Sequence, residues 1–271
     1  MSENKIYLCA ISNIESGTCN EDCKFCTQSV KYKADIQRYR RKEIEDIVKE
    51  AIIARKNRAI GFCLVTAGTG LDDKRLDYVC RAASAIKKEL GDELSLIACN
   101  GIATLEQLKE LKKHGIENYN HNLETAQEFY NEICTTHPWE DRYQTCLNAK
   151  EAGLQLCTGG IFGLGETQEN RISMLKSIAS LEPMSVPINF FHPNDALPIV
   201  KNSISREEAF ELIKLSREYL PNQMIMIAGG RELMFKEQEY DVFKYGANSL
   251  VVGDYLTTAG KTAQEDIDAI E

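Results

Sequence analysis

The sequence has no apolar run that approaches the roughly 18 residues of a membrane helix. Its first residues, MSENKIYLCAIS, lack the basic stretch, apolar stretch and small-residue cleavage site of an export signal. No segment rich in proline, glycine or serine divides the chain, and the six prolines stand singly. These absences predict one domain, residues 1–271, in the cytoplasm, with no contact to a membrane.

Positive charge is outnumbered by negative charge, since 32 Lys and Arg stand against 41 Asp and Glu and the formal net charge is -9. A negative protein is poorly suited to bind nucleic acid or anionic lipid, so neither is expected as a partner. One basic run, KYKADIQRYRRK (31–42), surrounds two tyrosines. We interpret it as a solvated helix entry or as a basic rim for an anionic small molecule, rather than as an RNA site.

Eight short apolar runs alternate with longer amphipathic stretches, which is the pattern of repeated βα units. Strands are expected at 6–12, 61–67, 94–100, 116–122, 154–160, 185–191, 224–230 and 248–254. Helices are expected at 43–58, 73–90, 104–113, 125–132 continuing through 140–152, 168–181, 206–219, 232–245 and 263–270. Thr104 and Gln107 form a capping-box pattern, and Gly115 and Gly153 fit left-handed helix ends. Eight units in about the length of a (β/α)8 barrel predict an α/β TIM barrel, with its chemistry at the carboxyl ends of the strands.

Three cysteines, Cys19, Cys23 and Cys26, stand in the loop after the first strand with the spacing C-x3-C-x2-C. Thiolates select zinc or iron-sulfur clusters. Structural zinc requires four ligands, and no His or Cys follows within ten residues of Cys26. A [4Fe-4S] cluster with one open iron fits three thiolates better, and the open iron invites a cofactor to complete it.

The other cysteines divide by position. Cys63, Cys99 and Cys157 fall in or at the end of the second, third and fifth strands. If these three cysteines face inward, they converge at one point inside a closed barrel. The alternative is that they are three buried thiols unrelated to one another. The remaining cysteines are interpreted as core filling or as incidental: Cys9, Cys80, Cys134 and Cys146.

The segment CNEDCKFC resembles the C-x3-C-x-aromatic-C motif of the radical S-adenosylmethionine (SAM) superfamily, with Phe25 as the aromatic residue. The resemblance implies that the open iron of the [4Fe-4S] cluster binds SAM, which is then cleaved to methionine and a 5'-deoxyadenosyl radical. A second segment, GGIFGLGE, lacks the G-x-G-x-x-G of dinucleotide sites and resembles the superfamily motif that passes beside the adenine. Its residues are Gly159, Ile161, Gly163 and Glu166.

Over nearly its whole length the chain resembles the biotin synthase family. The resemblance is carried in order by GFC, IACN, YNHNLET, LCTGGIFGLGE, SVPINFF, AGGRE and GANSLVVGDYLTT. It implies that dethiobiotin receives a sulfur atom and becomes biotin, at the cost of two molecules of SAM. It further implies that Cys63, Cys99 and Cys157 bind a second, auxiliary iron-sulfur cluster that supplies the sulfur.

The family resemblance also implies roles for four polar residues. Asn122 and Asn189 match substrate-binding positions, and Glu124 and Arg142 match positions at the cofactor; the role of His121 stays open. Strand-end capping is the alternative for Asn122, Glu124 and Asn189, and an exposed helix arginine is the alternative for Arg142. A flavodoxin or ferredoxin electron donor and a homodimer are expected.

The chain departs from the family at two points. Met226 stands at the position where better-known members have an arginine that binds the auxiliary cluster. Arg231 does not align with that arginine. The fourth ligand and the nuclearity of that cluster, [2Fe-2S] or another, are therefore open. The terminal segments of longer members are also missing. The alternative functions are another radical SAM enzyme, such as a cofactor maturase or a methylornithine-forming mutase, and a non-catalytic cluster carrier.

Overall fold

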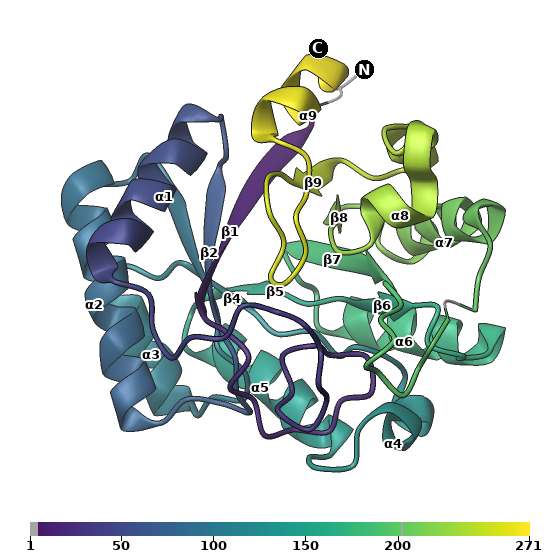
Figure 1. Ribbon diagram of the computed structural model, residues 1–271, viewed down its shortest axis with the longest axis horizontal. Coiled ribbons are helices and arrows are strands. Elements are labelled where there is room, and N and C mark those ends of the chain that lie inside the picture. The colour runs from purple at the N-terminus through teal and green to yellow at the C-terminus, as the bar shows by residue number, and fades with distance from the viewer. Residues whose placement is uncertain (1–4, 202) are drawn as a thin grey trace.

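Parallel strands form one sheet that closes into a barrel (Figure 1) in the computed structural model, which describes residues 5–201 and 203–271. The strand order is β5-β4-β3-β2-β1-β9-β8-β7-β6, and a further pairing of β5 with β7 closes the ring. The strands are β1 (Tyr7–Glu15), β2 (Gly61–Thr66), β3 (Ser95–Cys99), β4 (Asn118–Asn120), β5 (Gln155–Cys157), β6 (Gly160–Phe162), β7 (Ser185–Phe190), β8 (Met224–Ile227) and β9 (Ser249–Val251). The predicted TIM barrel is confirmed.

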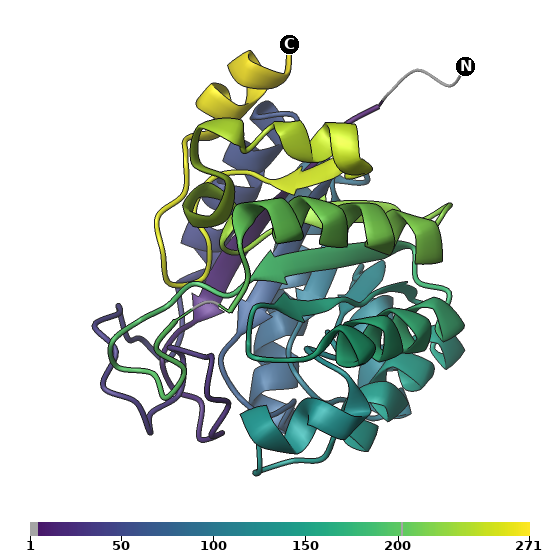
Figure 2. The same cartoon turned by 90° about the vertical axis from the view of Figure 1, so that its right-hand side faces the viewer.

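Helices surround this barrel (Figure 2). They are α1 (Ile44–Lys56), α2 (Asp73–Leu90), α3 (Leu105–Lys113), η1 (Gln127–Phe129), α4 (Tyr130–Ile133), α5 (Trp139–Glu151), α6 (Gln168–Ser180), α7 (Arg206–Tyr219), α8 (Arg231–Phe235), η2 (Lys236–Gln238), η3 (Asp241–Tyr245) and α9 (Ala263–Ile270). The Thr104 capping box is present, and Gly115 and Gly153 have positive φ angles. The basic run 31–42 leads into α1, as a helix entry should. None of these helices in the described ranges is long and apolar enough to cross a membrane.

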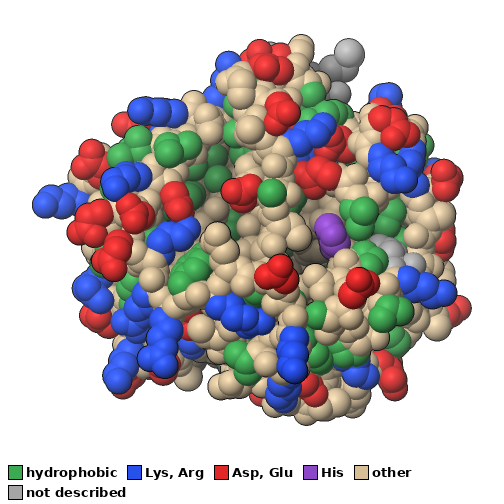
Figure 3. Space-filling view, in the orientation of Figure 1, with side chains coloured by type: hydrophobic (Ala, Val, Ile, Leu, Met, Phe, Trp, Pro, Cys, Tyr) green, Lys and Arg blue, Asp and Glu red, His purple; other side chains and the backbone are tan. Residues whose placement is uncertain are grey.

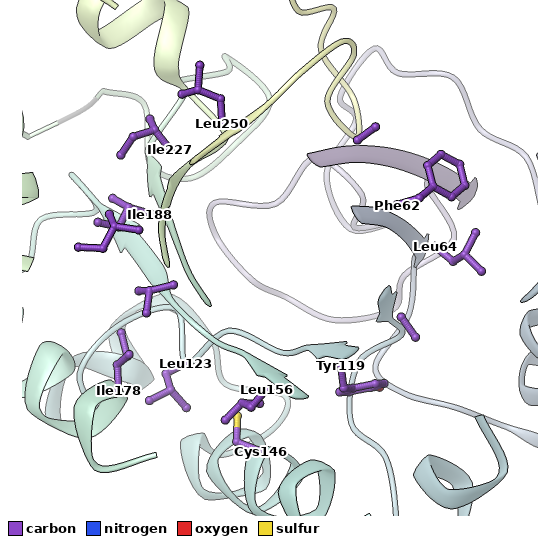
Figure 4. Packing of buried hydrophobic residues seen from close by; sticks show 14 of the residues in the cluster. Phe62, Leu64, Tyr119, Leu123, Cys146, Leu156, Ile178, Ile188, Ile227 and Leu250 are labelled. Carbon is purple, nitrogen blue, oxygen red and sulfur yellow. The ribbon is translucent and has the colours of Figure 1, made fainter. Parts of the chain in front are cut away.

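Alternate residues of each strand face opposite sides of the barrel wall. In β2, Phe62 and Leu64 belong to the large core beneath the helices, whereas Cys63 and Val65 belong to a small separate cluster. Figure 4 shows the outer set, including Tyr119, Leu156 and Ile227, directed from the strands toward the helices. The inner set therefore lines the space that the strands enclose.

The expected fifth strand is interrupted, because β5 and β6 both pair with β7 but not continuously. Cys157 pairs with Ser185, and Gly160 pairs with Ile188 in the same register. Pro187 stands between these two pairs and has no N–H to donate to the ladder. The predicted strand 154–160 is thus correct in place, with a break that proline imposes.

The helix expected at 232–245 is wrong as a single element. α8, η2 and η3 replace it, and the chain breaks at Lys236, whose φ angle is 50°. The turn allows Glu239, which is buried, to reach the guanidinium of Arg231 at 3.2 Å. A continuous helix would not fold back in this way.

Candidate active site

The barrel encloses a cavity of about 300 Å³ that extends from the loop after β1 to the inner faces of the strands. At its mouth lie Phe25 and Thr27 of that loop, and Thr257 of the loop after β9. The Thr27 and Thr257 hydroxyls are 2.9 Å apart, so the two loops meet over the opening. The space-filling view in Figure 3 shows a hollow near the middle of the visible face.

The three-cysteine loop is held in shape by the side chain of Gln28. Its Oε1 accepts hydrogen bonds from the Gly17 N–H at 2.6 Å and from the Ser16 hydroxyl at 3.2 Å. The backbone N–H of Cys19 donates to the carbonyl of Gln28, and that of Cys26 donates to the carbonyl of Cys23. The sequence around the cysteines thus folds back on itself and brings the thiols to one place.

The electrostatics of these thiols fit a metal cluster. Burial raises the pKa of Cys19, and it raises the pKa of Cys26 to about 12, to which the nearby Cys19 thiol adds. Cys26 in turn adds to the raised pKa of Cys23. Three neighbouring thiols in a poorly solvated loop stay protonated unless a cation replaces the protons, and soft cations are the ones that thiolates bind.

Cys134 is buried in the core, as expected, but it also has specific partners. Its Sγ lies 3.6 Å from that of Cys23 and 3.5 Å from Nδ1 of His137. His137 also bonds Glu21 Oε2 at 2.6 Å. The hydrogen bond that Cys23 donates to Cys134 is the largest cause that raises the pKa of Cys23. Sequence spacing gave no signal for this contact, because it joins the loop after β1 to the segment after α4.

Glu124 and Arg142 lie together near the cysteine loop. The carboxylate and guanidinium are 3.6 Å apart, and the Arg142 and Glu124 side chains are only 12% and 14% exposed. Arg142 also donates to the Tyr130 hydroxyl at 2.6 Å and to the Asn122 carbonyl at 2.9 Å. The alternative of an exposed helix arginine is therefore wrong.

One oxygen of Glu124, Oε2, is buried without a hydrogen-bond partner among the described residues. Burial raises the pKa of this carboxyl, and Arg142 opposes the shift. A buried polar atom without a partner is costly. Its position beside the cysteine loop fits a bound ligand that donates a hydrogen bond, such as a ribose hydroxyl.

The glycine-rich segment packs tightly behind the cavity. A Cβ on Gly159 would lie 1.9 Å from the carbonyl oxygen of Pro187, so only glycine fits there. Ile161 lines the cavity. Glu166 accepts hydrogen bonds from the N–H groups of Gly163 and Leu164 and so closes the turn that follows β6.

Deep in the cavity, Cys63, Cys99 and Cys157 all line the wall. A hydrogen bond with Cys99 is the largest cause that raises the pKa of Cys63 well above its usual value, and Cys157 adds to the shift. Burial raises the pKa of Cys157 to about 11. The structure thus brings the three thiols to one inner surface.

Cys9 is a buried core residue, as expected, and it also lines the same cavity. Met226 lies beside it in a small cluster with Val251. Arg231 does not line the cavity; its guanidinium is buried against Asp266 at 2.8 Å. The position of Cys9 was missed because its strand, IYLCAIS, is apolar on both faces, and composition does not tell the inner face from the outer.

Asn122 and Asn189 also line the cavity. Asn122 Oδ1 accepts from the Gly159 N–H at 3.1 Å, and Asn189 Oδ1 accepts from the Gly229 N–H at 2.9 Å. Both therefore cap backbone groups, as the alternative expected, and still face the cavity. His121 is buried outside the cavity lining.

Two family models match the chain. The Radical SAM superfamily matches residues 16–178, and the Biotin and Thiamin Synthesis associated domain matches residues 187–271. The chain is 83% identical to the biotin synthase of Aliarcobacter butzleri over all of its own length and 95% of that protein. It is 63% identical to the biotin synthase of Nitratiruptor over 98% of its length and 95% of that protein.

The chain belongs to the biotin synthase family. Membership of this radical SAM family implies a [4Fe-4S] cluster and SAM as cofactors. The sheet runs across the boundary between the two matched regions, since β6 pairs with β7. The division into a single domain of residues 1–271 stays a prediction.

Solved structures support the fold. The methylornithine synthase PylB matches with a TM-score of 0.80 over 99% of this chain and 78% of its own. The hydrogenase maturase HydG from Carboxydothermus hydrogenoformans matches with a TM-score of 0.82 over 98% and 66%. Both are 20% identical to this chain, so they support the shared radical SAM barrel and not a shared reaction.

Proposed function

We propose that this chain inserts sulfur into dethiobiotin to form biotin, with two molecules of SAM consumed for each biotin. The observation that carries the proposal is a single cavity that Cys63, Cys99 and Cys157 line and to which the three-cysteine loop contributes Phe25 and Thr27. A substrate in this cavity would face both that loop and the three thiols. Full-length identity to biotin synthases supports the choice of substrate.

At the mouth, we propose that Cys19, Cys23 and Cys26 hold the [4Fe-4S] cluster. Bound there with SAM, the cluster supplies the 5'-deoxyadenosyl radical that abstracts hydrogen from unactivated carbons. Phe25, Gly159, Ile161 and Gly163 would bound the SAM site. Glu124 would accept a hydrogen bond from SAM through its free oxygen, and Arg142 would hold that carboxylate in place.

At the base, we propose that Cys63, Cys99 and Cys157 hold the auxiliary cluster, as [2Fe-2S] or with another nuclearity. Asn122 and Asn189 would orient dethiobiotin by hydrogen bonds from the cavity wall. No Lys, Arg, Asp or Glu is among the described residues that line the cavity. This lining suits radical chemistry, because an aliphatic C–H bond offers a general base no acidic proton.

The test is an anaerobic assay of reconstituted protein with SAM, dethiobiotin and a low-potential reductant. Biotin and 5'-deoxyadenosine are the expected products, and protein with Cys19, Cys23 and Cys26 all changed to Ala should form neither. Cleavage of SAM without biotin would contradict the proposal. It would favour the runner-up, another radical SAM enzyme such as a maturase or mutase; cluster transfer without SAM cleavage would favour a carrier.

The proposal also includes an electron donor, an oligomeric state and a cellular compartment. A flavodoxin or ferredoxin is the proposed electron donor, and the chain is proposed to act as a homodimer, which light scattering in solution tests. The cytoplasm is the proposed compartment. All ten cysteines are free thiols, which is consistent with a reducing environment.

A further inference from the structure

We propose that Cys9 is a fourth cysteine ligand of the auxiliary cluster, beside Cys63, Cys99 and Cys157. This inference rests on the proposed function, which requires a cluster at the base of the cavity. It concerns the ligand that the sequence left open at Met226.

The strand geometry directs Cys9 into the barrel. Leu8, which precedes Cys9 in β1, belongs to the outer core beneath the helices, whereas Cys9 and Ile11 pack in the inner clusters. Side chains alternate along a strand. Cys9 is thus on the face that lines the cavity, as are the three other cysteines.

The absence of a side chain at one position of the neighbouring strand β2 leaves room for the Cys9 sulfur. Cys9 is in register with Gly61 of β2. A Cβ built on Gly61 would lie 3.3 Å from Cys9 Sγ and 3.0 Å from Cδ1 of Ile97. Because Gly61 carries no side chain, the Cys9 thiol occupies inner space that a side chain at residue 61 would restrict.

The Cys9 thiol is close enough to the others to interact with them. Burial raises the pKa of Cys9 to about 12, and the nearby Cys157 raises it further. Cys9 in turn contributes to the raised pKa of Cys63. Four thiols therefore share one inner surface. They come from β1, β2, β3 and β5, strands on one side of the ring that the pairing order makes nearly consecutive.

A buried serine hydroxyl adds an independent indication. Ser249 is fully buried in β9, and its Oγ has no partner at hydrogen-bond geometry among the described residues. The hydroxyl lies by Cys9. A hydroxyl that is free to donate beside a thiol suits a sulfur that carries negative charge when metal is bound.

Charge explains why Cys9 is preferred to Met226. No Lys or Arg is among the described lining residues, so several thiolates need cations at this depth, and iron supplies them. Metal binding breaks the S–H bond of Cys9, forms an Fe–S bond and releases the proton to solvent. Met226 offers only a neutral thioether, and it packs against Cys9, Ala228 and Val251 as an apolar side chain.

The experiment isolates the auxiliary site in full-length protein with Cys19, Cys23 and Cys26 changed to Ala. After anaerobic reconstitution with iron and sulfide, bound iron, bound sulfide and Mössbauer spectra are measured. Cys9→Ala is compared in this background with Cys80→Ala, a buried thiol of α2 outside the cavity lining. Met226→Leu removes the thioether at similar volume. Circular dichroism of the apo forms checks that each variant folds.

We expect Cys9→Ala to lower bound iron at least twofold or to change the Mössbauer parameters, and Cys80→Ala and Met226→Leu to do neither. Cys9→Ser, which keeps the strand packing and offers an oxygen ligand, should retain iron with an altered spectrum. Unchanged iron and an unchanged spectrum in folded Cys9→Ala would overturn the role of Cys9 alone. If the background protein itself binds no iron, the auxiliary cluster and the proposed function fail with it.

Discussion

At the scale of single residues, Glu124 combines an unusual backbone conformation with a proposed role in binding SAM. Its φ angle is 67°, which is rare for a residue other than glycine. The carbonyl of Glu124 accepts from the Ile161 N–H at 2.8 Å and so joins the end of β4 to β6. Backbone strain of this kind persists where the surroundings hold it, and it collects at ligand sites.

Glu124→Gln should weaken SAM binding to protein that holds its [4Fe-4S] cluster. A hydrogen bond to a charged group contributes about 1.5 kcal/mol or more, and about 1.4 kcal/mol corresponds to a tenfold change in Kd. We therefore expect a rise in Kd of about tenfold, measured by equilibrium titration with SAM. Glu132→Gln, an exposed carboxylate of α4, is the matched control and should leave Kd unchanged. Equal Kd values in the two variants would contradict the role of Glu124.

The sequence was informative for residues that form local motifs and poor for residues that meet through the fold. The C-x3-C-x2-C spacing lies within one loop, so its geometry could be anticipated. Cys134 meets Cys23 across more than a hundred positions. Cys9 required knowledge of which strand face looks inward, and a strand that is buried on both sides carries no polar alternation to reveal it.

At the scale of elements, the alternation of strands and helices was predictable because each βα unit buries its own apolar faces. The errors fall where a tertiary contact overrides local pattern. Pro187 in β7 interrupts the pairing of its neighbour, and the turn at Lys236 divides the expected helix. Pro187 lies outside the strand whose pairing it interrupts. The turn at Lys236 accompanies the contact of Glu239 with Arg231.

The buried ion pair of Arg231 and Asp266 fixes α9 against α8. The two groups are 2.8 Å apart, and the side chains are 1% and 0% exposed. Asp266 also accepts a hydrogen bond from Tyr240 at 2.9 Å. Removal of Asp266 leaves the buried Arg231 with Glu239 as its remaining buried carboxylate partner, and breaking a buried ion pair typically costs about 3 to 5 kcal/mol.

Asp266→Ala should therefore lower the free energy of unfolding of the apo protein by about 3 to 5 kcal/mol. Anaerobic urea denaturation followed by circular dichroism measures the change. Asp268→Ala, on the exposed side of the same helix, should change it by less than about 0.5 kcal/mol. A similar effect from both substitutions would mean that helix propensity, not the buried pair, stabilises this end of the barrel.

At the scale of the whole molecule, the barrel has one weak seam. β5 and β7 share only the pair Cys157 and Ser185 before the break at Pro187, whereas β1 and β2 pair along their length. Short pairing exposes backbone hydrogen bonds to local opening. The seam carries Cys157, while the other proposed ligands of the auxiliary cluster stand on β1, β2 and β3.

An auxiliary cluster should thus tie β5 at the seam to β1, β2 and β3 and slow the opening of the seam. We expect amide hydrogen exchange at 155–160 and 184–186 to fall when the cluster is reconstituted in protein whose Cys19, Cys23 and Cys26 are changed to Ala, because a ligand that binds only the closed state stabilises it. Exchange in α2, which lies outside the cavity lining, should not change. If exchange at the seam is the same with and without cluster, Cys157 does not bind it, and the thiols at the base of the cavity would have to be explained as packing.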